Sequence, residues 1–377
     1  MKKTTVFIDV YYYKAALSGI RTYINELSLA IVEHGSENIE YTFSHDINKL
    51  VNNQLYLNSS NQLIRWLFQL NYLIWKQVIL PFKLLFYKPD YLICPDYISP
   101  RLTFGTKRIT VIHDSLFWDY PKNYSFLWRK YFISLINFGI NEKTQIITTS
   151  NHSKKNLLKV IKKTTLIHYV YQSFENVIDS KNNLESKLQL PESYILHIGS
   201  FEKRKDLITL VKAFHVIKKQ ESNKKIKLVL AGAQVVNGNK KIIKQINRYV
   251  LNNDLENEVI LPNYISNEDT YQYYKNALIY VFSSVDEGFG IQIIESFTNS
   301  LPVICSDTPI FKEIGNDSVC YFKMGDFISL SQKIQTLINS KDLRKELSKK
   351  GKSQLNKFSR KKFIKGFEDL LIDRNEK

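Results

Sequence analysis

The sequence predicts an α/β protein built from two Rossmann-like domains, each a doubly wound parallel sheet covered by helices. The chain has 377 residues, more than one hydrophobic core usually organises. Short aliphatic runs alternate with amphipathic helical patterns along most of it. A polar stretch that contains a proline, residues 172–192, interrupts this alternation as a linker would. We therefore expect domains at 1–175 and 176–355, and a C-terminal helix at 356–377 that packs back toward the N-terminal domain.

Each domain is predicted from its own series of strands. In the first half, strands are expected at 4–10, 39–44, 91–95, 108–113 and 145–150. In the second half, they are expected at 194–199, 227–232, 258–262, 278–284 and 302–306. Ligands of such sheets gather at the carboxyl ends of the parallel strands, so two sheets that face each other would enclose a ligand cleft.

Charge and cysteine content limit the classes of partner. The chain carries 53 Lys and Arg against 36 Asp and Glu, a formal net charge of +17. Nucleic acid, anionic lipid or a phosphorylated small molecule could each be attracted, and a plainly solvated lysine surface is the alternative. The three cysteines form no CxxC pair, which indicates a reducing compartment and offers no thiolate zinc site. The N-terminus alternates like a strand and lacks a cleavage site, so we expect a cytoplasmic protein without a leader.

The most lipid-like segment is residues 63–87. Arg65, Lys76, Pro81 and Lys83 interrupt it, whereas a spanning helix needs about 20 nearly uncharged residues. The region from 55 to 88 is the candidate for peripheral contact with an anionic membrane, and packing of this helix into the core is the alternative.

Two adjacent cations follow the first strand of the second half. In "YILHIGSFEKRKDLITLVKAF" a buried strand ends at Gly199, a loop carries Arg204 and Lys205, and a helix begins near Asp206. Cations beside the amide donors of a helix N-terminus form a credible clamp for a diphosphate. The alternative is a basic loop in which Asp206 is an ordinary N-cap.

Two glutamates flank a glycine turn in "DEGFGIQIIE". Glu287 lies in a loop after a strand, Gly288-Phe289-Gly290 turns the chain, and Glu295 lies in the helix that follows. Carboxylates are good acceptors for sugar hydroxyls, so this arrangement indicates a ligand with hydroxyls at both ends and negative charge between them, such as a nucleotide sugar. The alternatives are a helix N-terminal charge with a surface glutamate, or a glycosidase-like acid and nucleophile, for which nothing in the sequence raises the pKa of one carboxyl.

The first half offers weaker candidates. His113 and Asp114 end a predicted strand, where the imidazole could contact a reacting sugar and Asp114 could orient it, although a structural histidine is the common alternative. Gly19 opens a helix after the first strand and could approach a phosphate, or simply belong to a helix cap. The sequence has no GxGxxG, GxxxxGK[ST], HExxH or Asp-x-Asp, which disfavours dinucleotide cofactors, P-loop chemistry and a metal-held diphosphate.

Taken together, these segments resemble the retaining glycosyltransferases of group 1, or family 4, which have the GT-B fold. The likeness is carried by the Glu-x7-Glu motif "EGFGIQIIE", "NSLPVICSDTPIFKEIG" and "ILHIGSFEKRKDL", and in the first half by "TVIHD", "SGIRTYINEL" and "IITTSNHSKKNLL". The sequence departs from the family pattern in its loops, which leaves the sugar open, at Asn151, Asp206, Asn299, Ser300 and Lys312.

The resemblance implies a role for each candidate residue. Glu295 would bind the donor's ribose and Glu287 the transferred sugar, with Lys205 and Arg204 on the diphosphate. Backbone amides around Gly288, Phe289 and Gly290 would meet the sugar and phosphate. His113 would lie beside the transferred sugar, with Asp114 as its orienting partner, and Gly19 would lie near the diphosphate and acceptor.

The resemblance also implies the reaction. It is transfer of a hexose, without a metal or another cofactor, from a UDP- or GDP-linked sugar to a glycan or lipid-linked acceptor hydroxyl, as in bacterial mannosyltransferase-like enzymes of capsule, O-antigen or exopolysaccharide biosynthesis. The enzyme would be cytoplasmic, with peripheral contact at the inner face of the cell membrane. A GT-B-fold nucleotide-sugar epimerase and a non-enzymatic polyanion-binding protein are the alternatives, and nucleic acid is not an expected partner. The sequence does not predict the base, the sugar, the acceptor, the linkage or the oligomeric state.

Overall fold

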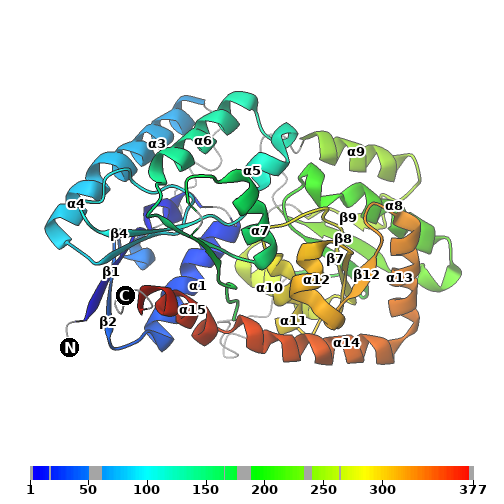
Figure 1. The fold of residues 1–377 in the computed structure, drawn as a ribbon. Coiled ribbons are helices and arrows are strands. Elements are labelled where there is room, and N and C mark those ends of the chain that lie inside the picture. Colours follow the sequence, from blue (N-terminus) through cyan, green and yellow to red (C-terminus); the bar gives the residue numbers. More distant parts are fainter. Residues whose placement is uncertain are drawn as a thin grey trace. The chain divides into compact units, whose positions relative to one another are not determined.

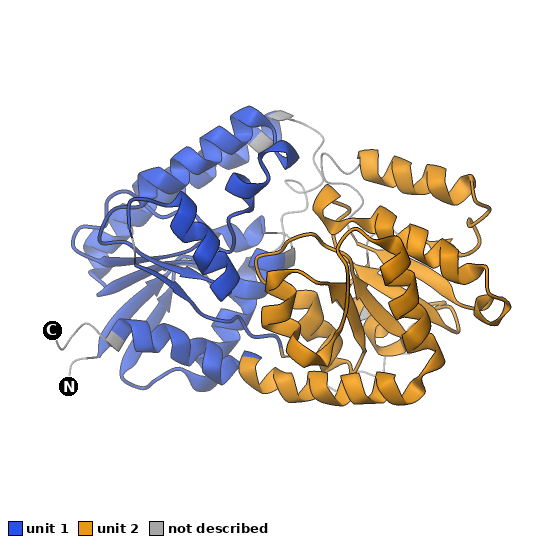
Figure 2. Ribbon diagram, turned by 45° about the vertical axis from the view of Figure 1, so that its right-hand side comes forward, with its two compact units in different colours: residues 1–174, 358–377 blue, residues 175–357 orange. Residues whose placement is uncertain are grey.

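The computed structural model describes residues 3–16, 18–50, 62–164, 166–175, 188–232, 240–262 and 265–372 (Figure 1). The chain divides into two compact units. Unit 1 consists of residues 1–174 and 358–377, and unit 2 of residues 175–357 (Figure 2). The boundary between Phe174 and Glu175 lies within the segment 172–192 that was expected as a linker, of which residues 176–187 lie outside the described part of the chain.

Unit 1 contains a six-stranded sheet in which all neighbours are parallel, in the order β2-β1-β3-β4-β5-β6. Its strands are β1 Thr4–Ile8, β2 Ile39–Phe43, β3 Tyr91–Cys94, β4 Lys107–Val111, β5 Gln145–Thr148 and β6 Ile167–Tyr169. Its helices are α1 Ser18–His34, α3 Gln62–Ile74, α4 Leu80–Tyr87, α5 Leu116–Asp119, α6 Phe126–Gly139, α7 Asn151–Val160 and α15 Arg360–Ile372. A π-helical turn, η3 Trp75–Ile79, joins α3 to α4.

The C-terminal helix α15 belongs to unit 1, where it packs on α1. The guanidinium of Arg360 donates to both carboxylate oxygens of Glu26, at 3.0 and 3.1 Å, and to Glu33 at 2.7 Å. Phe363 and Phe367 are fully buried in the same core as strands β1 and β3. The last helix therefore completes the hydrophobic core that the first strands begin.

Unit 2 repeats the plan, with a parallel six-stranded sheet in the order β12-β11-β10-β7-β8-β9. Its strands are β7 Tyr194–Ile198, β8 Lys227–Ala231, β9 Val259–Ile260, β10 Ile279–Phe282, β11 Val303–Ser306 and β12 Cys320–Phe322. Its helices are α8 Leu207–Lys218, α9 Lys240–Leu251, α10 Asn267–Asn276, α11 Ile291–Thr298, α12 Pro309–Gly315, α13 Phe327–Asn339 and α14 Lys341–Gln354. Because β7 pairs directly with β10, the loops that follow these two strands lie next to each other.

The predicted α/β class and parallel sheets are confirmed, and each predicted strand lies within a residue or two of an observed one. Strands β6 and β12, each only three residues long, were not predicted from the sequence. A run that short gives no periodic signal, and its strand geometry comes from pairing with β5 or β11. In the described part of the chain, no helix is both long and apolar enough to cross a bilayer.

Candidate active site

Two loops at the carboxyl ends of β7 and β10 are tied together in unit 2. The loop after β7 forms a short 3₁₀ turn, η5 Lys203–Lys205, before α8. The amide of Val285 donates to the carbonyl of Arg204 at 2.8 Å, and the Ser283 hydroxyl donates to the carbonyl of Lys205 at 2.7 Å. These bonds fix the backbone of both cations against the loop that carries Glu287.

The structure brings Arg204, Lys205 and Glu287 into one ion-pair cluster. Glu287 Oε1 lies 2.5 Å from Lys205 Nζ, and Oε2 lies 2.5 Å from Arg204 Nη1. The side chains are buried, with exposed fractions of 10% for Glu287, 12% for Arg204 and 4% for Lys205. Arg204 is also held from its other side by Glu202, whose Oε2 accepts from Nε at 2.8 Å.

Opposing effects set the charge states in this cluster. Burial alone would raise the pKa of the Glu287 carboxyl, but the charges of Arg204 and Lys205 outweigh it and lower the pKa to about 2. Burial lowers the pKa of the Lys205 amine, and Glu287 opposes that shift. The paired, ionised state is therefore the stable one, and the carboxylate expected on the sugar pairs with both cations expected on a diphosphate.

Glu295, the second glutamate, has a different environment on α11. Its Oε2 accepts a hydrogen bond of 2.6 Å from the Tyr274 hydroxyl. Burial raises the pKa of the Glu295 carboxyl, and the Tyr274 bond and the charge of Lys205 only partly oppose this. A raised pKa of one carboxyl was not expected from the sequence, because burial of a side chain depends on the tertiary fold and not on the local pattern. Lys205 interacts electrostatically with both glutamates, so one ammonium links the two ends of the motif.

The glycine turn between the glutamates is set by backbone geometry. Gly290 has φ of +88° and forms the N-cap of α11, a conformation that favours glycine. A Cβ at this position would also lie 3.1 Å from the ring of Phe311. Phe289 is buried, with 5% of its surface exposed, so its side chain anchors the turn in the core.

His197 lies in β7, the strand that precedes the cation loop, and was not among the site residues predicted from the sequence. The residue is fully buried, and its Nδ1 is 2.9 Å from the Val281 carbonyl, to which it donates as the protonated nitrogen. Burial lowers the pKa of the imidazole to about 4, so the ring is neutral near pH 7. Among the described residues, Nε2 has no hydrogen-bond partner. A Cβ built on Gly199 would lie 3.3 Å from this Nε2 and 3.8 Å from Lys205 Nζ, so both nitrogens border the same space.

In unit 1, His113 follows β4. Its Nε2 lies 2.9 Å from the Pro95 carbonyl, the edge of Tyr23 packs on its ring, and burial lowers its pKa to about 4. As a neutral ring that donates through Nε2, it presents Nδ1 as an acceptor. Asp114 Oδ1 accepts from the amide of Leu116 at 3.1 Å. Gly19 is the second residue of α1 and is exposed, with open space where a side chain would be.

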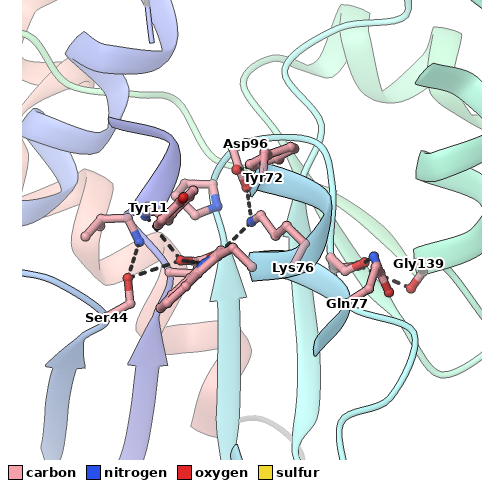
Figure 3. Close-up of polar contacts among 12 residues, drawn as sticks. Tyr11, Ser44, Tyr72, Lys76, Gln77, Asp96 and Gly139 are labelled. Carbon is pink, nitrogen blue, oxygen red and sulfur yellow. Dashed lines mark hydrogen bonds and ion pairs between the residues drawn. The ribbon is translucent and has the colours of Figure 1, made fainter. Parts of the chain in front are cut away.

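A second charged cluster, which we call the Lys76 triad, consists of Lys76, Asp9 and Asp96, and the two aspartates follow β1 and β3 at the carboxyl edge of the unit 1 sheet. Figure 3 shows the contact between Lys76 and Asp96. Lys76 Nζ lies 2.7 Å from Asp9 and 2.6 Å from Asp96, and all three side chains are fully buried. Trp75 Nε1 donates to Asp9 at 2.9 Å and the Tyr72 hydroxyl to Asp96 at 2.8 Å. Lys76, which interrupted the lipid-like segment in the sequence, therefore points into the core.

No group of three or more His, Cys, Asp or Glu side chains that could hold a metal occurs in the ranges that the structure describes.

The known proteins that this chain resembles in sequence and in fold include several glycosyltransferases. A family model described as glycosyl transferases group 1 matches residues 180–354. The O-antigen chain mannosyltransferase RfbU of Salmonella typhimurium is 25% identical over 227 residues, 60% of this chain and 59% of RfbU, so the match spans little more than half of that relative. A Campylobacter jejuni N-acetylgalactosaminyltransferase, named for a diphospho-undecaprenol-linked acceptor, is 27% identical over 72% of each chain. The crystal structure of WaaG, a glycosyltransferase involved in lipopolysaccharide biosynthesis, superposes with a TM-score of 0.66 at 11% identity, covering 98% of this chain and 99% of WaaG, and so shares the fold.

Proposed function

Because this chain belongs to the group 1 glycosyltransferases, we propose that it is a retaining hexosyltransferase that uses a nucleotide-diphosphate sugar as donor. The observation that carries the proposal is the buried cluster of Arg204, Lys205 and Glu287 at the carboxyl ends of β7 and β10. The cluster combines two cations suited to a diphosphate with a carboxylate suited to sugar hydroxyls.

Donor binding exchanges the partners in this cluster. Without donor, Glu287 pairs with both cations and Glu202 pairs with Arg204, and the diphosphate competes for the two cations as a doubly charged ligand. Once Lys205 and Arg204 turn to phosphate oxygens, the Glu287 carboxylate is free to accept hydrogen bonds from hydroxyls of the transferred sugar. The internal ion pairs keep the cations in place and ionised until the donor arrives.

The chemical step places its developing charge on the diphosphate. The bond between the sugar C1 and the phosphate oxygen breaks, the acceptor oxygen bonds to C1 on the same face, and the acceptor's proton goes to the departing phosphate oxygen. Lys205 and Arg204 stabilise the leaving group in a buried environment, where such charges act strongly. No protein nucleophile takes part in this scheme.

Glu295 is assigned to the donor's ribose. Tyr274 holds one of its carboxyl oxygens, which fixes the orientation of the carboxyl. The raised pKa of Glu295 brings the group nearer to neutrality, where it can donate as well as accept a hydrogen bond to a diol. Contacts of Gly288, Phe289 and Gly290 with the donor, and the roles of His113, Asp114 and Gly19, stay predictions.

The relatives support a surface glycan as acceptor. RfbU is named for O-antigen chains and the Campylobacter relative for a lipid diphosphate acceptor. We assign this chain a hydroxyl of a growing, lipid-linked glycan, and a cytoplasmic position with peripheral contact at the inner face of the membrane.

The test is a panel of UDP-, GDP-, ADP- and dTDP-sugars, scored by thermal shift and then by transfer to lipid-linked acceptors. Binding to the folded state raises the melting temperature by mass action. Lys205→Ala should abolish transfer, whereas Lys203→Ala, an exposed lysine of the same turn, should leave it unchanged. Absence of any nucleotide-sugar binding would overturn the proposal, and conversion of the donor without acceptor-dependent nucleotide release would indicate an epimerase instead.

A further inference from the structure

The outer face of α3, η3 and α4 exposes a row of large apolar side chains. Their exposed fractions run from 37% to 84%, and they are Leu63, Trp66, Leu67, Leu70, Ile74, Val78, Ile79, Phe82, Leu85, Phe86 and Tyr87. The inner face is buried in the cores of unit 1 through Phe68, Tyr72, Trp75, Leu80 and Leu84. The segment therefore packs into the core on one side, which is one of the two alternatives drawn from the sequence, and presents apolar surface on the other. Soluble monomers rarely expose a continuous apolar patch of this kind.

The π turn keeps this row in line. Leu70, Ile74, Val78, Phe82 and Phe86 are spaced four apart, and in an α-helix of 3.6 residues per turn such a row drifts by about 40° each turn. The wider turn of η3 takes up part of the drift. Figure 1 shows α3 and α4 following one another as a nearly continuous rod along one side of unit 1. The result is an extended apolar face rather than a helical spiral.

Charge along this face has one sign. Residues 62–87 contain no Asp or Glu, and Lys83 and Lys88 lie on α4 and at its end. A face that is apolar and aromatic, with cations but no Asp or Glu within residues 62–87, matches the boundary between acyl chains and anionic headgroups.

A pocket at the C-terminal end of α4 adjoins the apolar face. Its volume is about 460 Å³, and Leu85 belongs both to its wall and to the apolar row. Three lysines line it, namely Lys3, Lys88 and Lys107. The one acidic side chain among its lining residues is Asp90, whose Oδ2 already accepts from the amide and the hydroxyl of Thr5, both at 2.8 Å. The pocket thus offers net positive charge beside apolar surface, as a phospholipid phosphate with its acyl chains requires.

We propose that this face of unit 1 docks on a bilayer of anionic phospholipid. The apolar row of α3 and α4 enters the boundary between headgroups and acyl chains, and the pocket of Lys3, Lys88 and Lys107 holds a lipid phosphate. The inference rests on the proposed function only for its setting, an acceptor carried by a membrane lipid.

Vesicle flotation of the full chain tests the proposal, using phosphatidylcholine vesicles with and without phosphatidylglycerol. The wild-type chain should bind the anionic vesicles. Lys88→Gln combined with Lys107→Gln should weaken that binding by about tenfold or more and remove the preference for anionic lipid. Trp66→Ser, Phe82→Ser and Phe86→Ser together should abolish binding to both vesicle types.

Matched controls lie in unit 2. Lys345→Gln with Lys349→Gln removes the same charge from the exposed side of α14, and Leu251→Ser with Ile328→Ser removes exposed apolar groups. Both controls should bind like wild type, and thermal melts should show that every variant folds. The proposal is wrong if wild type binds neither vesicle, if the controls lose binding as the test variants do, or if the serine variants instead dissociate a dimer. Nucleotide-sugar binding is measured without vesicles, so failure of the docking surface and failure of the donor site are distinguishable.

Discussion

Lys205 and Glu287 form a buried ion pair across two neighbouring strands, with Lys205 Nζ 2.5 Å from Glu287 Oε1. The two residues are 82 positions apart in the chain and meet because β7 pairs with β10. In the absence of a ligand, the buried ammonium of Lys205 and the buried carboxylate of Glu287 in the candidate site are therefore paired with each other. Donor binding must therefore replace one set of charge-assisted bonds with another.

Glu287→Gln should remove an acid-dependent part of the stability. The pKa of Glu287 in the folded chain is about 2, below its ordinary value of 4.5, so the ionised carboxylate stabilises the fold above pH 4.5. That stabilisation is lost as the pH falls from about 4.5 toward 2. Urea unfolding between pH 7 and pH 3 should therefore show a shallower decline in the variant than in wild type. The variant should also be less stable by about 3 kcal/mol at pH 7, since Lys205 loses a buried partner. Parallel pH curves for the two proteins would contradict the assigned charge state.

Glu295→Gln should lower the affinity for the donor without lowering the stability of the fold. The pKa of Glu295 is raised in the folded chain, so ionising this group costs folding free energy at neutral pH. The glutamine keeps the hydrogen bond from Tyr274 without the charge, and the melting temperature at pH 7 should be unchanged or higher. Donor affinity should fall by about tenfold or more if the carboxyl binds the ribose. The control is Gln292→Glu, which makes the opposite exchange one turn earlier on α11. If the Glu295→Gln protein melts well below wild type, the carboxylate stabilises the fold and the prediction is wrong.

Replacement of Lys76 in the Lys76 triad should lower the stability of unit 1, whereas replacement of Asp96 should not. Lys76→Met leaves two buried carboxylates without their cation and should cost about 3–5 kcal/mol, whereas Lys49→Met, an exposed lysine, should cost almost nothing. Burial raises the pKa of Asp96 to about 6, above its ordinary 3.8, so wild type gains stability as the pH falls from about 6 toward 4. Asp96→Asn should lack this gain and be at least as stable as wild type at pH 7. Unfolding followed by urea titration at pH 7, 6 and 4 checks both statements.

The sequence predicted the sheets, and it pointed to the two loops of unit 2 that carry Arg204, Lys205 and Glu287, because both features depend on local pattern. Buried parallel strands are continuous aliphatic runs, and the cations and glutamates stand directly after such runs, where ligands bind. The sequence did not predict which side chains form ion pairs and hydrogen bonds with one another. The Arg204 and Lys205 pairing with Glu287, the Tyr274 contact with Glu295 and the Lys76 triad all join segments that the topology brings together, and no local pattern encodes those pairings.

A feature of the sequence could have identified His197 as a candidate site residue. His197 is the one polar side chain in the aliphatic strand "YILHIG" apart from the initial tyrosine, and a buried imidazole needs a reason to be there. In the structure, Nδ1 is hydrogen-bonded to the Val281 carbonyl. The other ring nitrogen, Nε2, borders the space beside Gly199 and Lys205.

We expect His197→Phe to weaken donor binding while the fold survives. The phenyl ring keeps the packing against Tyr280 and Phe282 but removes the Nε2 acceptor, a loss of about 1 kcal/mol or roughly five- to tenfold in donor affinity. His215→Phe on α8, whose ring contacts Tyr249 at the surface of the unit, should leave affinity unchanged. Calorimetry with the nucleotide-diphosphate sugar measures affinity, and the ¹⁵N resonance of Nε2 in histidine-labelled protein should move when this donor is added. An Nε2 signal that does not respond to the donor, together with wild-type affinity in His197→Phe, would assign His197 to packing alone.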